Sequence, residues 1–286
     1  MSVDPTVLVT GATGRVGRRV VAGLLDRGVR VRALVRAPRA AGLAPEVDLV
    51  QGDMFRPDTI AAAAAEADAA FLLWPGYSAD GAAQVIAELS HHVSHVVYLS
   101  AARLQRDEDG PMPGVWEEIE AILRRAPITW TFIRGGGFAA NTLEWAEQIR
   151  SGVVVRMPYP EAARSLVHEH DVADLAVPAL LDRARAGRAY VATGPETLTQ
   201  QDQVRIIGDV LGRPLRVERQ SPDQAEAELA ESAGKAFAQQ ALAYWAGLVR
   251  DPERVSTDVQ DITGRPARSY AQWVSDHASD FASPST

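Results

Sequence analysis

The chain has 286 residues, 47% hydrophobic and 23% charged, enough to bury the core of one large α/β domain or of a domain with an appended lobe. Its formal net charge is −8, and no stripe of basic residues offers the clustered cations that nucleic-acid binding needs. The absence of cysteine excludes disulfides, thiolate catalysis and cysteine-ligated metals.

A short apolar strand, residues 7–10, runs directly into Gly11-Ala12-Thr13-Gly14-Arg15-Val16-Gly17 and then into an amphipathic helix that stops at Gly28. Gly11 allows a sharp turn, Gly14 lets a pyrophosphate approach the backbone, and Gly17 lets the helix pack close to the strand. The free N–H groups at the start of the helix suit phosphates. An ordinary strand-to-helix turn is the alternative, but the order strand, glycines, helix, strand favours a dinucleotide-binding βαβ unit.

The second strand, residues 29–35, ends at Arg36, where an NAD-specific enzyme usually carries an acid for the ribose 2′-hydroxyl. A guanidinium at this position suits a 2′-phosphate, and Arg15 and Arg39 add positive charge to the same corner. The sequence therefore favours NADP(H) over NAD(H). The alternative is that Arg36 is a solvated surface charge.

Strand and helix patterns continue to alternate through the first half of the chain. The further strands are expected at 47–50, 69–74, 95–100 and 128–133, and the further helices at 58–67, 79–91, 115–125 and 141–150. This rhythm predicts an α/β fold, with residues 1–150 forming a Rossmann-type, doubly wound parallel sheet that binds the cofactor.

Beyond residue 150 the pattern loosens. We expect short strands at 153–157 and 165–167, a helix at 171–181 that contains Pro178, and a returning sheet strand at 189–193. Helices then dominate, with capping boxes at Thr199/Asp202, Ser221/Gln224 and Ser269/Gln272. Residues 151–286 are therefore predicted to form a smaller, mostly helical substrate lobe, integrated with the core into one compact unit.

No signal peptide is evident, and no apolar run approaches the ~20 residues that a membrane helix needs. We therefore expect a cytoplasmic protein with a small-molecule substrate that binds neither nucleic acid nor membrane. The oligomeric state is not predicted.

Several motifs together resemble the NmrA-like group of atypical short-chain dehydrogenases/reductases. They are Thr10 to Gly17, Arg36, Gly52-Asp53, Tyr98-Leu99-Ser100, Ile133-Arg134-Gly135-Gly136-Gly137-Phe138, Tyr190 to Pro195 with Leu198-Thr199, and Leu211-Gly212-Arg213-Pro214. This group includes quinone, imine and isoflavone-type reductases, and also redox-sensing regulators that only bind cofactor.

The resemblance implies a set of residues that bind NADP(H). They are Gly11, Thr13, Gly14, Arg15, Val16 and Arg36 at the phosphates, Asp53 and Met54 at the adenine, Leu73, Trp74 and Pro75 on the ribose side, and Ser100 and Ala101 on the nicotinamide side. Structural roles are the alternatives: Asp53 ending a strand, Trp74 in the core, and Ser100 satisfying a loop amide.

The usual catalytic pair of short-chain dehydrogenases is absent. None of the six tyrosines is followed four residues later by a lysine, and Lys235 is the one lysine of the chain. NmrA-like reductases often carry a His followed four residues later by Glu, and here these positions hold Trp116 and Glu120. Trp116 either lines the pocket or packs in the core, and Glu120 is expected to be a solvated helix residue.

The substrate pocket is expected to be lined by aromatic and amide side chains. They are Tyr77, Trp116, Phe138, Asn141, Trp145 and Tyr159. Asn141 is equally suited to cap the predicted helix 141–150, because Glu144 follows at capping-box spacing.

His168 and Tyr159 are candidate proton donors, although the sequence does not identify the catalytic residues. The run His168-Glu169-His170-Asp171 suggests a metal. Strand alternation would separate Glu169 from the two histidines, and Asp171 is placed to cap the next helix, so no metal site is expected.

These observations favour an NADPH-dependent reductase that transfers hydride to a small hydrophobic or aromatic substrate. Enones, quinones and imines accept hydride with little acid assistance, so the missing Tyr and Lys do not exclude this chemistry. The alternatives are a non-catalytic NADP(H)-sensing regulatory protein, and a non-redox isomerase or cyclase on the same fold.

Overall fold

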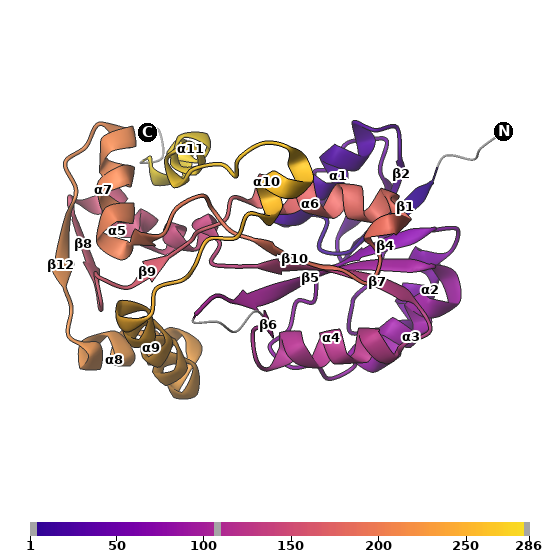
Figure 1. The fold of residues 1–286 in the computed structure, drawn as a ribbon, viewed down its shortest axis with the longest axis horizontal. Helices are drawn as coiled ribbons and strands as arrows, with labels where there is room; N and C mark the ends of the chain where they lie inside the picture. Colours follow the sequence, from indigo (N-terminus) through magenta and orange to yellow (C-terminus); the bar gives the residue numbers. More distant parts are fainter. Residues whose placement is uncertain (1–4, 106–109, 283–286) are drawn as a thin grey trace.

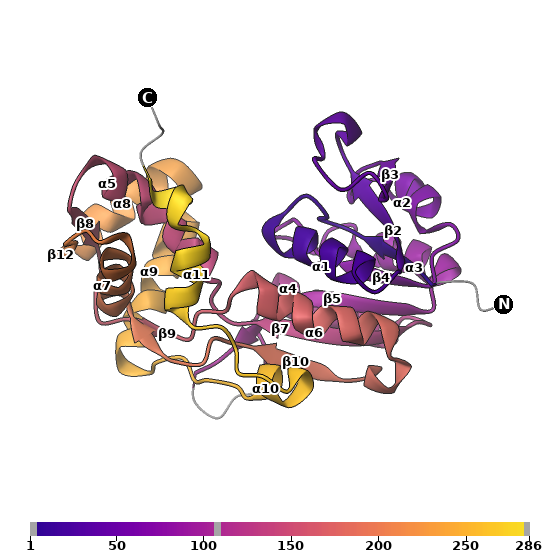
Figure 2. The ribbon, with the colours of Figure 1, turned by 90° about the horizontal axis from the view of Figure 1, so that it is seen from above.

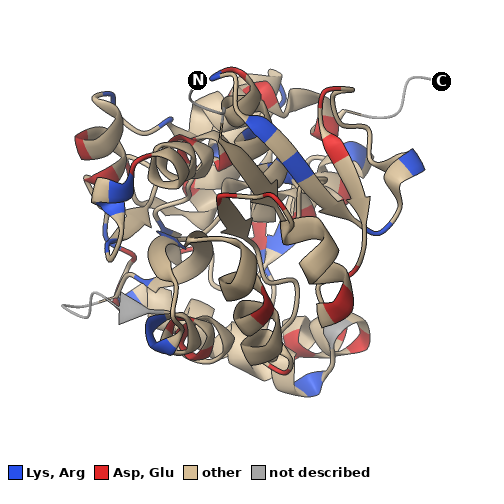
Figure 3. Ribbon diagram, turned by 90° about the vertical axis from the view of Figure 1, so that its right-hand side faces the viewer, with Lys and Arg blue, Asp and Glu red and all other residues tan. Residues whose placement is uncertain are grey.

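A computed structural model describes residues 5–105 and 110–282. A sheet unit and a C-terminal lobe lie side by side along the long axis of the molecule (Figures 1 and 2). The end that carries the N-terminus belongs to the sheet unit, and its acidic and basic residues are interspersed (Figure 3).

The central sheet of the described residues contains seven parallel strands in the order β10-β7-β5-β4-β1-β2-β3, with the short β6 antiparallel to β5. The order reverses beside β1, which creates a topological switch point between β1 and β4. The strands are β1 (Thr6–Val9), β2 (Arg30–Val35), β3 (Asp48–Gln51), β4 (Ala69–Leu72), β5 (His95–Arg103), β6 (Gly110–Pro111), β7 (Thr129–Gly135) and β10 (Ala189–Ala192). The predicted Rossmann-type sheet is confirmed.

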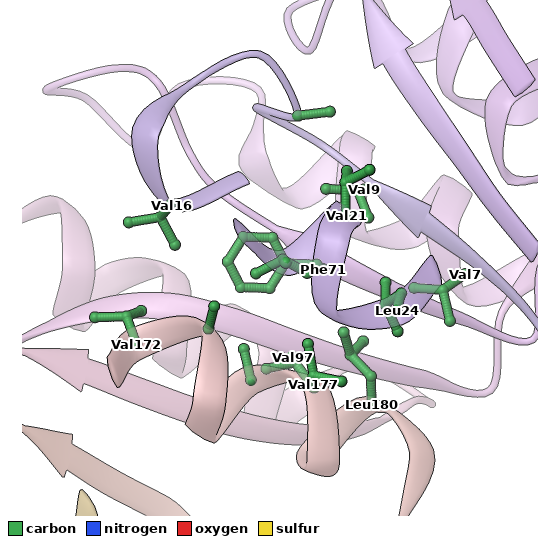
Figure 4. Packing of buried hydrophobic residues seen from close by; sticks show 14 of the residues in the cluster. Val7, Val9, Val16, Val21, Leu24, Phe71, Val97, Val172, Val177 and Leu180 are labelled. Atoms are coloured by element: carbon green, nitrogen blue, oxygen red, sulfur yellow. The ribbon is translucent and has the colours of Figure 1, made fainter. Parts of the chain in front are cut away.

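Helices cover both faces of this sheet because alternate strand residues point to opposite sides. One face packs against α1 (Arg15–Leu25), α6 (Glu169–Leu181) and α10 (Asp258–Thr263). The other packs against α2 (Pro57–Ala64), α3 (Ala82–His92) and α4 (Val115–Arg125). Figure 4 shows the first of these cores, where side chains of α1 and α6 meet around Phe71 and Val97.

The C-terminal lobe has a hydrophobic core of its own, which includes Trp145, Tyr270 and Trp273. Its elements are η2 (Ala139–Trp145), α5 (Ala146–Ser151), β8 (Val154–Met157), β9 (Ala163–Arg164), β11 (Leu198–Thr199), α7 (Gln200–Leu211), β12 (Arg216–Arg219), α8 (Pro222–Ala233), α9 (Lys235–Arg250), α11 (Tyr270–Asp276) and η4 (Ala278–Phe281). All three predicted capping boxes are present. No helix within the described ranges is long and apolar enough to cross a membrane.

Chain segments cross between the two units on both sides of residue 150. The 3₁₀ helix η2 packs in the C-terminal core, whereas α6, α10 and β10 belong to the sheet unit. The hydrophobic core of each unit therefore contains residues from both sides of position 150. The division into residues 1–150 and 151–286 stays a prediction.

Three local expectations are wrong. The strand expected at 165–167 does not form: the strand of this segment is β9, which ends at Arg164, and Val167 makes only an isolated β-bridge. Residues 139–145 form a 3₁₀ helix whose N-cap is Phe138, so Asn141 lies inside a helical segment and does not cap an α-helix. The helix expected from residue 171 already begins at Glu169, because the His168 side chain accepts a hydrogen bond from the N–H of His170. His168, Glu169 and His170 therefore do not alternate along a strand, and Asp171 is not the cap.

Candidate functional site

The glycine loop, residues 10–17, follows β1 at the switch point and forms a cradle for an anion. Gly11 has a φ of +63°, and a Cβ built on Gly17 would lie 2.1 Å from the carbonyl oxygen of Gly11. Side chains are therefore excluded at both positions. Gly14 is the N-cap of α1, and no side chain caps this helix, so its first turn offers N–H groups and the positive end of the helix dipole. Thr13, Gly14 and Arg15 are exposed, and Val16 is buried.

Exposed arginines stand where β2 ends beside this loop. Arg36 follows β2 directly, and Arg39 lies in the short 3₁₀ helix η1 (Pro38–Ala40). Sequence analysis missed Arg18, which donates from Nε to the carbonyl of Thr13 at 3.0 Å and from Nη2 to that of Ala41 at 2.7 Å. Arg18 thus fastens the glycine loop to the segment after β2. Its position one helical turn after Arg15 was the available signal.

The segments after β3 and β4 border the same edge of the sheet. Leu73 lies against Gly11, and its N–H donates to Thr10 Oγ1 at 2.8 Å. The Asp53 carboxylate accepts from the N–H of Phe55 at 3.0 Å, so it stabilises the turn that ends β3. Beyond these, Met54 is buried and Pro75 is exposed.

Trp74 is a core residue whose ring reaches this edge. It is 9% exposed, and its Nε1 donates to the carbonyl of Ser78 at 2.8 Å. Its ring meets that of Phe55 edge to face, with centroids 5.5 Å apart, and Phe55 is 55% exposed. Phe55 is therefore an exposed aromatic face at this edge that sequence analysis missed.

A buried ionic network lies below the carboxyl ends of β5 and β7. Glu120 is 0% exposed and accepts from Ser100 Oγ at 2.8 Å, from Arg134 Nε and Nη2 at 2.8 and 2.7 Å, and from Arg124 Nη2 at 2.8 Å. The expectation that Glu120 is solvated is wrong, because two guanidinium groups and a hydroxyl replace water around its carboxylate. Ser100 directs its hydroxyl to Glu120, and Ala101 next to it is partly exposed.

The segment that follows β7 closes the sheet against the C-terminal lobe. The Phe138 ring lies so close to Gly135 that a Cβ there would be 3.0 Å away. Phe138 also pairs with Val167 through an isolated β-bridge. Trp145 is 4% exposed in the C-terminal core, whereas Asn141 and Glu144 are exposed.

Three residues of distant segments form what we call the junction cluster: Arg164, Tyr244 and Glu253. Arg164 Nε donates to Glu253 Oε1 at 3.0 Å, and the Tyr244 hydroxyl donates to the same oxygen at 2.6 Å. The Arg164 guanidinium also fills the space that a side chain at position 137 would need. Burial raises the pKa of Tyr244. The cluster therefore holds a compensated charge beside the chain segment that follows β7.

The remaining residues of the predicted pocket are dispersed. Tyr77 is 86% exposed, and its ring centroid lies 6.3 Å from that of Phe237 in α9. Tyr159 is partly buried in the loop between β8 and β9, with a φ of +50°. Trp116 packs at the edge of the core beneath α4. The structure therefore brings Tyr77 to an aromatic residue of the C-terminal lobe but does not bring Trp116 or Trp145 to that contact.

His168 is only 1% exposed and joins α6 to α11. Its Nδ1 accepts from the N–H of His170, and its Nε2 lies 3.2 Å from Asp276 Oδ2. At the same contact between α6 and α11, His277 Nε2 lies 2.6 Å from Glu169 Oε1. Within the described ranges, no three His, Asp or Glu side chains are arranged to hold a metal.

Comparison with known proteins identifies the family. Residues 3–245 match the model of the NmrA-like family. The chain belongs to that family. A relative of this NmrA-like protein, the (4-alkanoyl-5-oxo-2,5-dihydrofuran-3-yl)methyl phosphate reductase of Streptomyces griseus subsp. griseus, is 37% identical over 283 residues, covering 96% of this chain and 99% of the relative.

A second relative supports the same placement, and a solved structure shows the same fold. The NAD(P)H azoreductase of Xenophilus azovorans is 30% identical over 291 residues, covering 96% of this chain and 99% of that one. The structure of triphenylmethane reductase from Citrobacter sp., solved with NADP(H), superposes with a TM-score of 0.79 at 20% identity, covering 95% of this NmrA-like chain and 99% of that one. At this identity, the similarity to triphenylmethane reductase shows a shared fold.

Proposed function

We propose that the protein is an NADPH-dependent reductase that transfers hydride to a small conjugated carbonyl compound. The geometry of the glycine loop carries the proposal. Its uncapped helix start leaves backbone N–H groups for a pyrophosphate, and the glycines keep the loop close to the helix, since a Cβ at Gly17 would lie 2.1 Å from the Gly11 carbonyl oxygen. Relatives at 37% and 30% identity that match nearly the whole chain are both named as reductases.

The name of the first relative indicates the substrate class. A 4-alkanoyl-5-oxo-2,5-dihydrofuran has a ring double bond conjugated to both the ring carbonyl and the alkanoyl carbonyl. Hydride addition to its far carbon leaves a negative charge that two carbonyl oxygens share. Such an acceptor needs little acid assistance, which agrees with a chain whose tyrosines are not paired with a lysine. We therefore place an enone of this kind ahead of quinones and imines.

In this proposal, the residues of the chain bind the cofactor and orient the two reactants. N–H groups of the first turn of α1 hold the pyrophosphate, and Arg36 with Arg15 and Arg39 holds the 2′-phosphate. NADPH supplies the hydride from its nicotinamide ring when it is bound. Phe138, beside the carboxyl ends of β5 and β7, provides an apolar wall for the substrate. Orientation of the two reactants contributes several kcal/mol, up to about 7–11 in well-aligned systems.

Calorimetric titration with NADPH, NADP⁺ and NADH tests the cofactor. We expect Arg36→Asp to weaken NADPH binding by roughly 10- to 100-fold, the equivalent of about 1.4–2.8 kcal/mol, because a carboxylate would face the 2′-phosphate. NADH binding should change less. Arg30→Asp, an exposed change at the other end of β2, is the matched control and should bind NADPH like the wild type.

Turnover with 4-deuterated NADPH and a 4-alkanoyl-5-oxo-2,5-dihydrofuran tests the reaction. Deuterium at the far carbon of the former double bond is the expected result. Turnover without deuterium transfer would instead indicate isomerisation or cyclisation. Cofactor binding without turnover of enones, quinones or imines would favour a sensor, and the absence of nucleotide binding would contradict both roles.

A further inference from the structure

Arg18 links the glycine loop to the segment that follows β2. Its N–H donates the first backbone hydrogen bond of α1, to the carbonyl of Gly14 at 3.0 Å, which fixes where the side chain starts. The guanidinium then donates to three further carbonyls: Nε to Thr13 at 3.0 Å, Nη1 to Gly42 at 2.6 Å and Nη2 to Ala41 at 2.7 Å. One side chain therefore joins two chain segments that are distant in the sequence.

The shape of the guanidinium makes this link possible. Its N–H groups lie in one rigid plane and point in different directions, so a single group can reach carbonyls of two segments, whereas a lysine ammonium is a compact point charge. The acceptors of Arg18 are neutral carbonyls, and within the described residues none of its hydrogen bonds goes to a carboxylate. The link is therefore made by the geometry of the side chain, not by pairing of opposite charges.

The glycine loop has contacts of its own that hold its shape. The N–H of Gly14 donates to the Gly11 carbonyl at 2.9 Å, and Leu73 packs against Gly11. Gly17 brings the first turn of α1 close to the same carbonyl. None of these contacts involves Arg18, so we expect the loop to keep its conformation when the guanidinium is removed.

The segment after β2 depends more strongly on Arg18. It contains the short 3₁₀ helix η1 (Pro38–Ala40), which is followed by Ala41 and Gly42. Ala41 is 1% exposed and packs in the core that α1 shares, and Gly42 has a φ of +57°. Both residues lie outside regular secondary structure, so no helix or sheet ladder orients their carbonyls. The Arg18 side chain is the donor that both carbonyls share.

The two exposed arginines of this segment are held in different ways. Arg36 follows β2 directly, and the sheet fixes the residue before it, because the carbonyl of Val35 accepts from the N–H of Gly52 at 3.0 Å. Arg39 lies in η1, whose C-cap is Ala41. Within residues 5–105 and 110–282, neither arginine forms an ion pair with an acidic side chain. The position of Arg39 therefore depends on what holds η1, and that of Arg36 depends on β2.

We propose that Arg18 is a positioning residue for cofactor selectivity: it holds η1 beside the glycine loop and so keeps Arg39 at the 2′-phosphate of NADPH. This inference rests on the proposed function, which places that phosphate beside Arg36 and Arg39. The three donors of the Arg18 guanidinium are used by the protein backbone, so the residue acts through Arg39. NADH has no 2′-phosphate, and its pyrophosphate needs the glycine loop alone. Loss of Arg18 should therefore weaken the binding of NADPH more than that of NADH.

Calorimetry with NADPH and with NADH tests the inference through the ratio of the two Kd values. Arg18→Met keeps an unbranched apolar stem and removes the donors. It should weaken NADPH binding by roughly 10-fold, the low end for one charge-assisted hydrogen bond to a phosphate, and change NADH binding by less than about 3-fold. Arg18→Lys keeps the charge without the planar fork, so it should lose about as much NADPH affinity.

Arg27→Met is the matched control. Arg27 lies beyond the other end of α1 and donates to the carbonyl of Gly23 in that helix at 2.8 Å, so it joins no second segment. This variant should bind both nucleotides like the wild type. Thermal unfolding shows whether each variant is folded. If Arg18→Met is not, Arg18→Lys, which keeps the charge, provides the comparison.

A double-mutant cycle with Arg39→Ala identifies the residue through which Arg18 acts. In the Arg39→Ala background, Arg18→Met should have little further effect on the ratio of the Kd values, because the side chain that it positions is gone. Additive effects in this cycle would overturn the inference. Wild-type NADPH affinity in Arg18→Lys would also overturn it, since the charge alone would then be sufficient.

Two further outcomes separate this inference from the proposed function. If the wild type prefers NADPH and Arg18→Met weakens both nucleotides equally or neither, Arg18 does not set the selectivity, and the placement of the 2′-phosphate stands. If the wild type binds NADPH no more tightly than NADH, that placement fails, and the role of Arg18 fails with it.

Discussion

The glycine loop and the junction with the C-terminal lobe present polar groups in different ways. At the glycine loop the donors are backbone N–H groups, fixed by glycines within eight consecutive residues. At the junction cluster the groups are side chains from β9 and α9, together with Glu253. The first region depends on residues that are neighbours in the sequence. The second depends on contacts between segments that are far apart in the sequence.

Gly17→Val should break the first region outright. Its Cβ would lie 2.1 Å from the Gly11 carbonyl oxygen, and backbone on both sides prevents relaxation. We expect overpacking to lower the stability of the fold by roughly 3 kcal/mol. The displaced loop should also bind NADPH about 100-fold more weakly. Calorimetry measures the affinity, and thermal unfolding shows whether the fold survives.

Gly247→Ala is the control for this change, because its position in α9 leaves room for a methyl group. It should bind NADPH like the wild type and gain up to about 1 kcal/mol of stability. Unchanged NADPH affinity in Gly17→Val would show that the loop does not hold the cofactor.

Glu120→Gln should lower the free energy of unfolding by removing the charge at the centre of the buried ionic network. The change leaves Arg134, which is 9% exposed, without its counter-charge, and breaking a buried ion pair costs about 3–5 kcal/mol. Denaturant unfolding measures this loss. The exposed neighbour Glu118 provides the control, and Glu118→Gln should stay within about 0.5 kcal/mol of the wild type. Equal stability of the two variants would mean that the network contributes nothing.

The same contrast explains which features of the fold and of the candidate site the sequence could predict. Gly11, Gly17 and the capping boxes act on neighbours within a few residues, so their spacing alone predicted the loop and the helix starts. Glu120 was misjudged because its partner Arg134 lies 14 residues away on another element, and a lone acid on a helix is normally solvated.

Glu144 was even harder to predict. Its spacing from Asn141 imitates a capping box, while the segment is a 3₁₀ helix with a period of three. The structure places it near Arg164, whose charge opposes the rise in the pKa of its carboxyl. Only the folded chain brings these charges together.

The contact between Tyr77 and Phe237 offers the mildest test, because it joins the loop after β4 to α9 across the two units. Tyr77 is 86% exposed, so removing one ring should cost the other little contact energy. In a double-mutant cycle of Tyr77→Ala and Phe237→Ala, we expect a coupling of about 0.5 kcal/mol, the low end for aromatic pairs. The measured quantity is the free energy of unfolding of the four proteins in the cycle, with the NADPH affinity as a reference that should not change. Additive effects would mean that the rings act independently and that this contact does not help to hold the loop after β4 against the C-terminal lobe.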